Sequence, residues 1–143
     1  MRTLLDVNVL VALLDKTHVH HRVATDWLAS HVQLGWASCP LTQNGCIRVL
    51  SLSSYRNSQS PASVAQRLRD AASDRSHEFW PDSVSLLDAG RAQWDHVLTS
   101  RQVTDAYLLA LAVSHGGRLL TLDRGIAVKA IAGAQAKHLV TLG

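Results

Sequence analysis

The sequence predicts an α/β domain of three layers, in which helices cover both faces of a central, mostly parallel sheet. Short apolar runs typical of buried strands alternate with segments whose apolar residues have helical spacing. This alternation is typical of strand–helix–strand units, whose strands lie parallel. No internal repeat, low-complexity tract or linker divides the 143 residues, so we expect a single domain over residues 1–143.

The elements expected in the N-terminal half follow from apolar spacing and from helix start signals. Residues 2–5 and 35–38 are short apolar runs, which predict buried strands. Pro40 and Pro61 stand where helices are expected to begin, a position that favours proline. The polar residues 51–63 predict a loop that leads into the second of these helices. Helices are expected over residues 7–14, 18–31, 40–50 and 61–73.

The C-terminal half contains the strongest helical pattern, over residues 104–115. Thr104 is its expected N-cap, Asp105 stands in its expected first turn, and Gly116 is a stop signal. A strand over 118–122 is expected to lead directly to Asp123. The remaining expected elements are a short strand at 77–80, one or two helical pieces within 85–100, a short helix at 127–132 and a last strand at 137–141.

Composition excludes several classes of protein. Hydrophobic residues make up 47% and charged residues 17% of the chain, which indicates a globular and not a disordered protein. The N-terminal apolar run is interrupted by Asp6 and Asn8, and no small-residue cleavage site follows it, so we expect no signal peptide. No apolar stretch is long enough to span a bilayer, and we expect a soluble, cytoplasmic protein without membrane contact. The net charge of +3 suits a polyanionic partner.

The only two cysteines are expected to be ordinary buried thiols. If Pro40 opens a helix, Cys39 and Cys46 lie about 10 Å apart along its axis, which is too far for a disulfide.

Two aspartates hold equivalent positions in the expected sheet. Asp6 comes directly after one apolar strand and Asp123 directly after another. Ligands of open parallel sheets bind beyond the carboxyl ends of the strands, so neighbouring strands place both acids at one edge. Asp105 begins a helix that runs antiparallel to the strand ending at Asp123. We therefore expect the three carboxylates to meet.

Three carboxylates in one place repel one another unless a cation neutralises them. Mg²⁺ prefers oxygen ligands, and a bound Mg²⁺ lowers the pKa of water and stabilises charge on a phosphodiester. The arrangement therefore predicts metal-assisted phosphodiester chemistry with Asp6, Asp105 and Asp123 as metal-binding and catalytic residues. Asn8, Thr104 and Thr121 are expected to support the carboxylates through an amide and two hydroxyls.

Four sequence blocks resemble, in order and spacing, the PIN-domain ribonucleases of the VapC type, toxins of type II toxin–antitoxin systems. The resemblance runs from about Met1 to Leu142. The blocks are L-L-D-V-N-V-L at 4–10, P-L-T-Q-N-G-C-I-R-V at 40–49, V-T-D-A-Y-L-L-A-L-A at 103–112 and L-L-T-L-D-R-G at 119–125.

The resemblance implies a fold, an activity and partners. It implies a PIN-like α/β/α domain and an acidic pocket that binds one or two Mg²⁺ or Mn²⁺ ions. It implies endonucleolytic cleavage of RNA, with tRNA or another structured RNA as substrate, which leaves a 5′-phosphate and a 3′-hydroxyl. It also implies a homodimer and a cognate VapB-type antitoxin whose C-terminal peptide covers the pocket.

One position departs from the family pattern. Asp6, Asp105 and Asp123 match the first, third and fourth acids of the family, but the second acid, normally a glutamate, is replaced by Gln43. The Gln43 carbonyl oxygen is expected to contact the metal without adding charge. We therefore expect weaker metal binding and a greater need for Mn²⁺. The alternative function is a weak or inactive PIN-fold module that binds RNA or antitoxin without cutting.

Basic residues that flank the acidic blocks are the expected RNA contacts, as a rim around the pocket. They are Arg48, Arg101, Arg118, Arg124 and Lys129.

Other function classes lack the residues they need. His18, His20 and His21 have no further Cys or His ligands at zinc-site spacing. A receiver-like signalling domain and a D-x-D phosphatase both need a pair of acids near the N-terminus, which the D-V-N at 6–8 does not supply.

Overall fold

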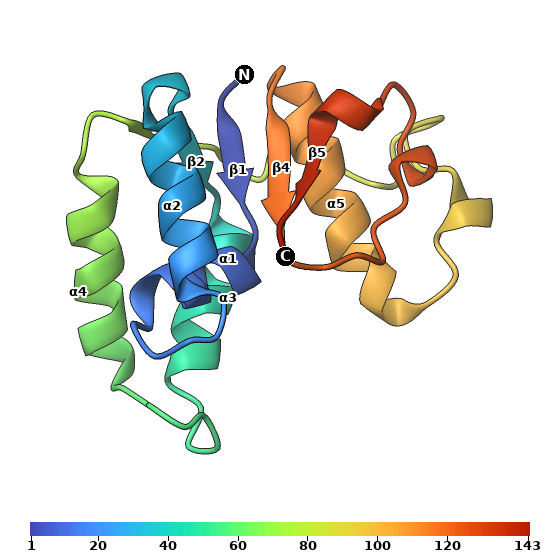
Figure 1. The fold of residues 1–143 in the computed structure, drawn as a ribbon. Coiled ribbons are helices and arrows are strands. Elements are labelled where there is room, and N and C mark those ends of the chain that lie inside the picture. The colour runs from blue at the N-terminus through green and yellow to red at the C-terminus, as the bar shows by residue number, and fades with distance from the viewer.

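The computed structural model describes residues 1–143 and contains one five-stranded, fully parallel sheet (Figure 1). The strand order is β3-β2-β1-β4-β5. The strands are β1 (Thr3–Leu5), β2 (Trp36–Ser38), β3 (His77–Phe79), β4 (Arg118–Thr121) and β5 (Leu139–Thr141). Each lies within a segment predicted to be a strand.

Five α-helices surround the sheet, and the predicted three-layer α/β fold is confirmed (Figure 1). The helices are α1 (Val7–Leu14), α2 (His21–His31), α3 (Pro40–Leu50), α4 (Pro61–Ala72) and α5 (Ser100–Ser114). Four short 3₁₀ helices connect them to the strands: Val32–Leu34, Trp94–His96, Val128–Ala130 and Ala136–His138. None of the helices combines the length and the apolar composition of a membrane-spanning segment.

Alternation along each strand divides the core into two apolar clusters, one on each face of the sheet. Leu4 and Leu119 belong to the cluster beneath α5. Leu5 and Leu120, the next residues along the same strands, belong to the cluster that also contains residues of α1, α2, α3 and α4. The sheet is therefore buried on both faces, as its continuous apolar strands require. Cys39 and Cys46 are buried, free thiols, in agreement with the sequence.

One predicted helix start was wrong, and two predicted helices are short 3₁₀ helices. Helix α5 begins at Ser100, after the N-cap Thr99, and not after Thr104. The Gln102 side chain accepts hydrogen bonds from the backbone N–H groups of Thr99 and Leu98, which starts the helix one turn earlier. Within residues 85–100 the only helix before α5 is the 3₁₀ helix Trp94–His96, and the predicted helix at 127–132 shortens to the 3₁₀ helix Val128–Ala130.

Helices α1 and α3 approach each other closely at Gly45. A Cβ atom on Gly45 would lie 2.6 Å from Cγ2 of Val7, the first residue of α1. Glycine lowers the stability of a helix interior. At position 45, however, the absence of a side chain makes room for the neighbouring helix α1.

We expect Gly45→Ala to lower the free energy of unfolding by about 1–3 kcal/mol, because the Val7 side chain must shift. In an open helix the same substitution stabilises by up to about 1 kcal/mol, so the sign of the change is diagnostic. Urea unfolding measures it, with the exposed neighbour substitution Asn44→Ala as a control. A Gly45→Ala chain as stable as the parent would show that the two helices do not pack this closely.

Candidate active site

Asp6 joins the end of β1 to the start of α1. Its backbone N–H donates to the Leu120 carbonyl at 3.0 Å, which continues the pairing of β1 with β4. Its Oδ1 accepts from the Val7 backbone N–H at 2.7 Å and caps α1. The side chain is buried, and it is fixed by the strand behind it and the helix in front of it.

The Thr121 hydroxyl connects the ends of β1 and β4. It donates to Asp6 Oδ2 at 2.6 Å and accepts from the Asp123 backbone N–H at 3.0 Å and from Asn8 Nδ2 at 3.4 Å. Asn8 Oδ1 in turn accepts from the Leu122 backbone N–H at 3.1 Å. Asn8 and Thr121 therefore hold the turn that carries Asp123, as the sequence predicted for supporting polar residues.

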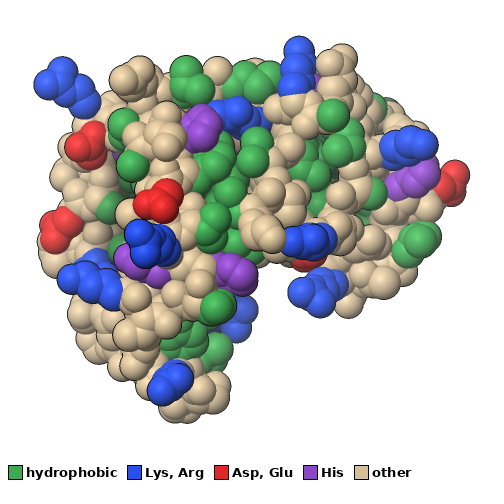
Figure 2. Space-filling model, in the orientation of Figure 1, with side chains coloured by type: hydrophobic (Ala, Val, Ile, Leu, Met, Phe, Trp, Pro, Cys, Tyr) green, Lys and Arg blue, Asp and Glu red, His purple; other side chains and the backbone are tan.

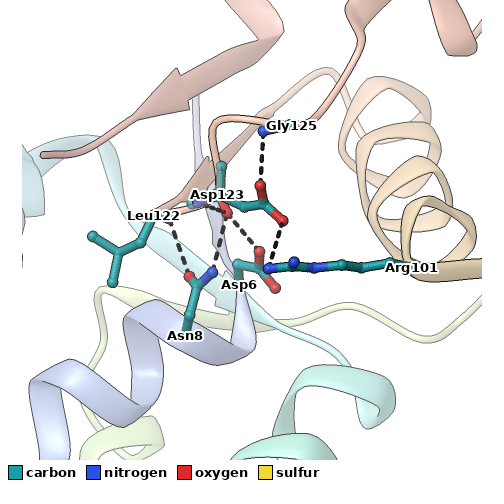
Figure 3. A network of polar contacts seen from close by, with 7 residues as sticks. Asp6, Asn8, Arg101, Leu122, Asp123 and Gly125 are labelled. Atoms are coloured by element: carbon teal, nitrogen blue, oxygen red, sulfur yellow. Dashed lines mark hydrogen bonds and ion pairs between the residues drawn. The ribbon is translucent and has the colours of Figure 1, made fainter. Parts of the chain in front are cut away.

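Asp123 and Asp105 complete an acidic group. Asp123 Oδ1 accepts from the Gly125 backbone N–H at 2.7 Å, and its Oδ2 lies 3.9 Å from Nη2 of Arg101, which reaches over from α5 (Figure 3). Asp6, Asp105 and Asp123 all line one pocket of about 820 Å³. The structure thus brings together the three acids selected from the sequence.

The pKa values reflect this crowding. Burial, followed by the charges of Asp6 and Asp123, raises the pKa of Asp105 to about 7. Burial also raises the pKa of Asp6, against the hydrogen bond from Thr121. The structure has no group of three or more His, Cys, Asp or Glu side chains arranged to hold a metal ion by themselves, so an ion at this pocket would also need waters as ligands. Hard oxygen donors whose charges destabilise one another suit a divalent cation that keeps several waters, such as Mg²⁺ or Mn²⁺.

Helix α3 presents Asn44, and not Gln43, to the acidic pocket. Leu41, Asn44, Gly45 and Arg48 line the pocket, at the i, i+3, i+4 and i+7 positions of one helix face. Gln43 lies beside a separate cavity of about 300 Å³, where its Nε2 donates to Ser38 Oγ at 2.9 Å.

The expectation that Gln43 lies at the acidic pocket is therefore wrong. Helical periodicity is the signal that would have identified Asn44, since it stands one turn before Arg48, which was already selected as a pocket residue.

The predicted basic rim is only partly present. Arg48 and Arg101 line the acidic pocket. Arg118 lies at the amino end of β4, opposite the acids, where its Nε donates to Thr3 Oγ1 and its guanidinium lies 5.1 Å from the Trp27 ring centroid.

The other predicted supporting and basic residues are all exposed. Thr104 lines the pocket without capping α5. Arg124 donates to the Gly143 carbonyl, and neither Arg124 nor Lys129 lines the pocket. His18 and Tyr55, which the sequence did not single out for this site, do line it.

Comparison with known proteins identifies relatives of this chain. The family model described as "PIN domain" matches residues 3–132. Ribonuclease VapC44 of Mycobacterium tuberculosis is 49% identical over 142 residues, which cover 99% of this chain and 100% of that protein. Ribonuclease VapC39 of the same species is 42% identical over 134 residues, which cover 93% of this chain and 96% of that protein.

Two solved structures share the fold. VapBC2 from Rickettsia felis, bound to a DNA fragment from their promoter, matches with a TM-score of 0.58 at 13% identity, over 88% of this chain and 96% of that chain. PAE2754 from Pyrobaculum aerophilum matches with a TM-score of 0.58 at 22% identity, over 94% of this chain and 82% of that chain.

We expect Asp105→Asn to stabilise the metal-free chain at pH 8. Because the folded-state pKa of Asp105 is raised to about 7, the folded chain retains a proton that the unfolded chain releases above about pH 4. Stability therefore falls as pH rises from about 4 to 7, and the amide removes this loss. The gain should be of the order of 1 kcal/mol, since water screens a half-buried carboxylate.

Urea unfolding in EDTA at pH 8 and pH 4 measures this difference. Asp26→Asn, on the exposed face of α2, is the matched control and should give no pH-dependent gain. An equal response of the two variants would mean that Asp105 is not crowded by the other acids.

We expect Asn44→Asp to increase the affinity for Mn²⁺ by about tenfold, because it adds a carboxylate to the pocket. Gln43→Glu should leave the affinity unchanged, because that side chain lies beside the other cavity. Isothermal titration calorimetry distinguishes the two. The opposite pattern would restore Gln43 as the metal-facing residue.

Proposed function

Since the chain belongs to the PIN-domain family, and within it to the VapC type, we propose that it is a metal-dependent endoribonuclease toxin. The observation that carries this proposal is the convergence of Asp6, Asp105 and Asp123 on one pocket beside Arg48 and Arg101. The relatives named ribonuclease VapC44 and VapC39 match nearly the whole chain, which supports the same activity.

The reaction is the hydrolysis of an RNA phosphodiester. Asp6, Asp105 and Asp123 would hold one or two Mg²⁺ or Mn²⁺ ions, with the Asn44 amide beside them. When bound, such a cation lowers the pKa of water and neutralises charge that develops on the phosphate.

The side chains of this chain hold the acids in position and accept the proton of the attacking water. Thr121 and Asn8 keep Asp6 and the Asp123 turn in one arrangement before substrate arrives. One of the three carboxylates would take the proton of the attacking water as general base. The water oxygen bonds to phosphorus, the bond to the 3′ oxygen breaks, and the proton passes to that leaving oxygen. The products are a 5′-phosphate and a 3′-hydroxyl.

Arg48 and Arg101 supply positive charge to an otherwise acidic pocket. Arg101 is almost fully exposed, with 86% of its side chain accessible, so it is free to exchange Asp123 for a phosphate. We propose a structured RNA such as tRNA as the substrate, cut in a single-stranded loop whose backbone can bend into the pocket.

A cognate VapB-type antitoxin and a homodimer complete the proposal. Support for an antitoxin comes from the Rickettsia felis VapBC2 structure, which shares the fold. An antitoxin peptide that covers the pocket would block the acids and the two arginines together.

The neutral Asn44 supports a second candidate, a module that binds RNA or antitoxin without cutting. With Gln43 in place of the family's glutamate and Asn44 on the pocket face of α3, the pocket holds three carboxylates and binds a cation less tightly. Cleavage distinguishes this candidate from the ribonuclease.

The decisive experiment incubates the purified chain with total tRNA in Mg²⁺, in Mn²⁺ and in EDTA. We expect cleavage with either metal, more with Mn²⁺, and none in EDTA. Asp105→Asn should reduce the rate by at least about 100-fold, since it removes a group that acts on the reacting atoms, whereas Asp26→Asn should cut like the parent. Sequencing of the RNA ends locates the bond. RNA binding without cleavage under every metal would establish the binding module.

A further inference from the structure

The acidic pocket continues along α1, away from the metal-binding end. His18, Arg48 and Tyr55 line the same pocket as the acids. Asp6 precedes α1 and Asp15 follows it, so the eight residues of this helix separate the two by about 12 Å. Figure 2 shows this face hollowed between two lobes, with Lys or Arg and His side chains along the edge of the hollow. The pocket is therefore longer than a site for three carboxylates and a cation requires.

A buried carboxylate fixes the Tyr55 side chain at the far end. Asp15 is 8% exposed, and its Oδ2 accepts from the Tyr55 hydroxyl at 2.5 Å. Its Oδ1 accepts from the backbone N–H of Thr17 at 3.0 Å, from the Thr17 hydroxyl at 2.9 Å and from Asn57 Nδ2 at 3.4 Å. These donors, led by Tyr55, hold the pKa of Asp15 below its usual value. Part of the Tyr55 ring also packs against the apolar cluster of α1 and α3.

The loop that carries Tyr55 is attached at both sides. The Gln59 backbone N–H donates to the Leu50 carbonyl at 2.9 Å. Arg67 of α4 donates to the Gln59 side chain at 3.3 Å and to the Leu14 carbonyl at the end of α1. The segment that the sequence predicted as a polar loop therefore presents an aromatic ring in a defined position, with little entropy left to lose on binding.

His18 and Arg48 give this end of the pocket one neutral and one charged donor. His18 Nδ1 accepts from the His20 backbone N–H at 3.0 Å, so the ring proton is on Nε2. Burial lowers the pKa of His18, which favours this neutral form. Arg48 stands one helical turn after Asn44 on the pocket face of α3, between the acids and the Tyr55 loop.

We infer that His18, Arg48 and Tyr55 form a distal subsite that binds an unpaired nucleotide of single-stranded RNA near the scissile bond. The base stacks on the Tyr55 ring, Arg48 contacts the phosphate that leads to it, and His18 donates to an acceptor of the same nucleotide. Stacking on one ring suits any base, because every base has a π face. The inference rests on the proposed function, since it names a binding subsite for the RNA that the acids would cut.

Comparing the affinities of two strands that carry the same phosphates, one with bases and one without, separates the contribution of base stacking from that of charge. The probes are a fluorescein-labelled oligoadenosine and an abasic strand of equal length, titrated by fluorescence anisotropy in EDTA. The Asp105→Asn chain serves as background, because it should cleave at least about 100-fold more slowly than the parent and carries one carboxylate less. We expect the oligoadenosine to bind about tenfold more tightly than the abasic strand, the difference that one stacked base provides.

Substitution at Tyr55 should remove this difference. Tyr55→Leu should bind the two strands with equal affinity, whereas Tyr55→Phe, which keeps the ring, should retain most of the preference for oligoadenosine. Phe79→Leu, an exposed aromatic residue on β3, is the matched control and should behave like the background. Arg48→Gln should weaken the binding of both strands by the same factor. It should also reduce the slope of log affinity against log salt by about one.

The outcomes separate this inference from the proposed function. A Tyr55→Leu chain that unfolds at the background temperature and still prefers oligoadenosine would overturn the distal subsite, as would an equal loss of affinity for both strands. If the distal subsite is overturned in this way but the unsubstituted chain cleaves tRNA, the ribonuclease proposal stands. A preference abolished by Tyr55→Leu, in a chain that cuts nothing, would support the subsite and refute the ribonuclease.

Discussion

Asp6 and Asp123 lie far apart in the sequence, and the parallel pairing of β1 with β4 brings them to one edge of the sheet. The register sets Leu5 beside Leu120, so Asp6 lies beside Thr121, the last residue of β4, and Asp123 follows two residues later. The single hydroxyl proton of Thr121 then determines the other hydrogen bonds of the site. Because Thr121 donates this proton to Asp6, its oxygen accepts from the Asp123 backbone N–H and from Asn8. The acidic site is therefore an extension of the hydrogen bonding of the sheet, and its geometry is as rigid as the strand pairing behind it.

The same closeness makes the acids unfavourable partners in the absence of a cation. Burial raises the pKa values of Asp6 and Asp105, and the neighbouring charges add to the rise. Active sites commonly lower the stability of a fold in this way, because side chains arranged to bind a ligand interact unfavourably with one another when the ligand is absent. Two buried apolar clusters, one on each face of the sheet, provide the stability that tolerates this arrangement.

The sequence predicted the fold and the three acids because both depend on patterns that are local and unambiguous. Short apolar runs identify strands, and an acid directly after each run must reach the carboxyl edge. The prediction failed where the direction of a side chain mattered. Gln43 was chosen by its position in a family motif, but rotation around α3 turns it toward Ser38 and leaves Asn44 at the pocket. Arg118 is the first residue of β4 and lies at the amino end of that strand, so nearness in sequence to Asp123 did not mean nearness in space.

Asp6 begins helix α1 as well as lining the pocket, and this double role affects how related sequences are interpreted. A chain that abandoned catalysis would still need a side-chain acceptor to start the helix, and Asp or Asn serves equally well. An acid retained at this position is therefore weak evidence for an active enzyme. Asp105 lies within α5, past its first turn, and starts no helix. Among relatives that have lost their activity, we would look for divergence first at that position.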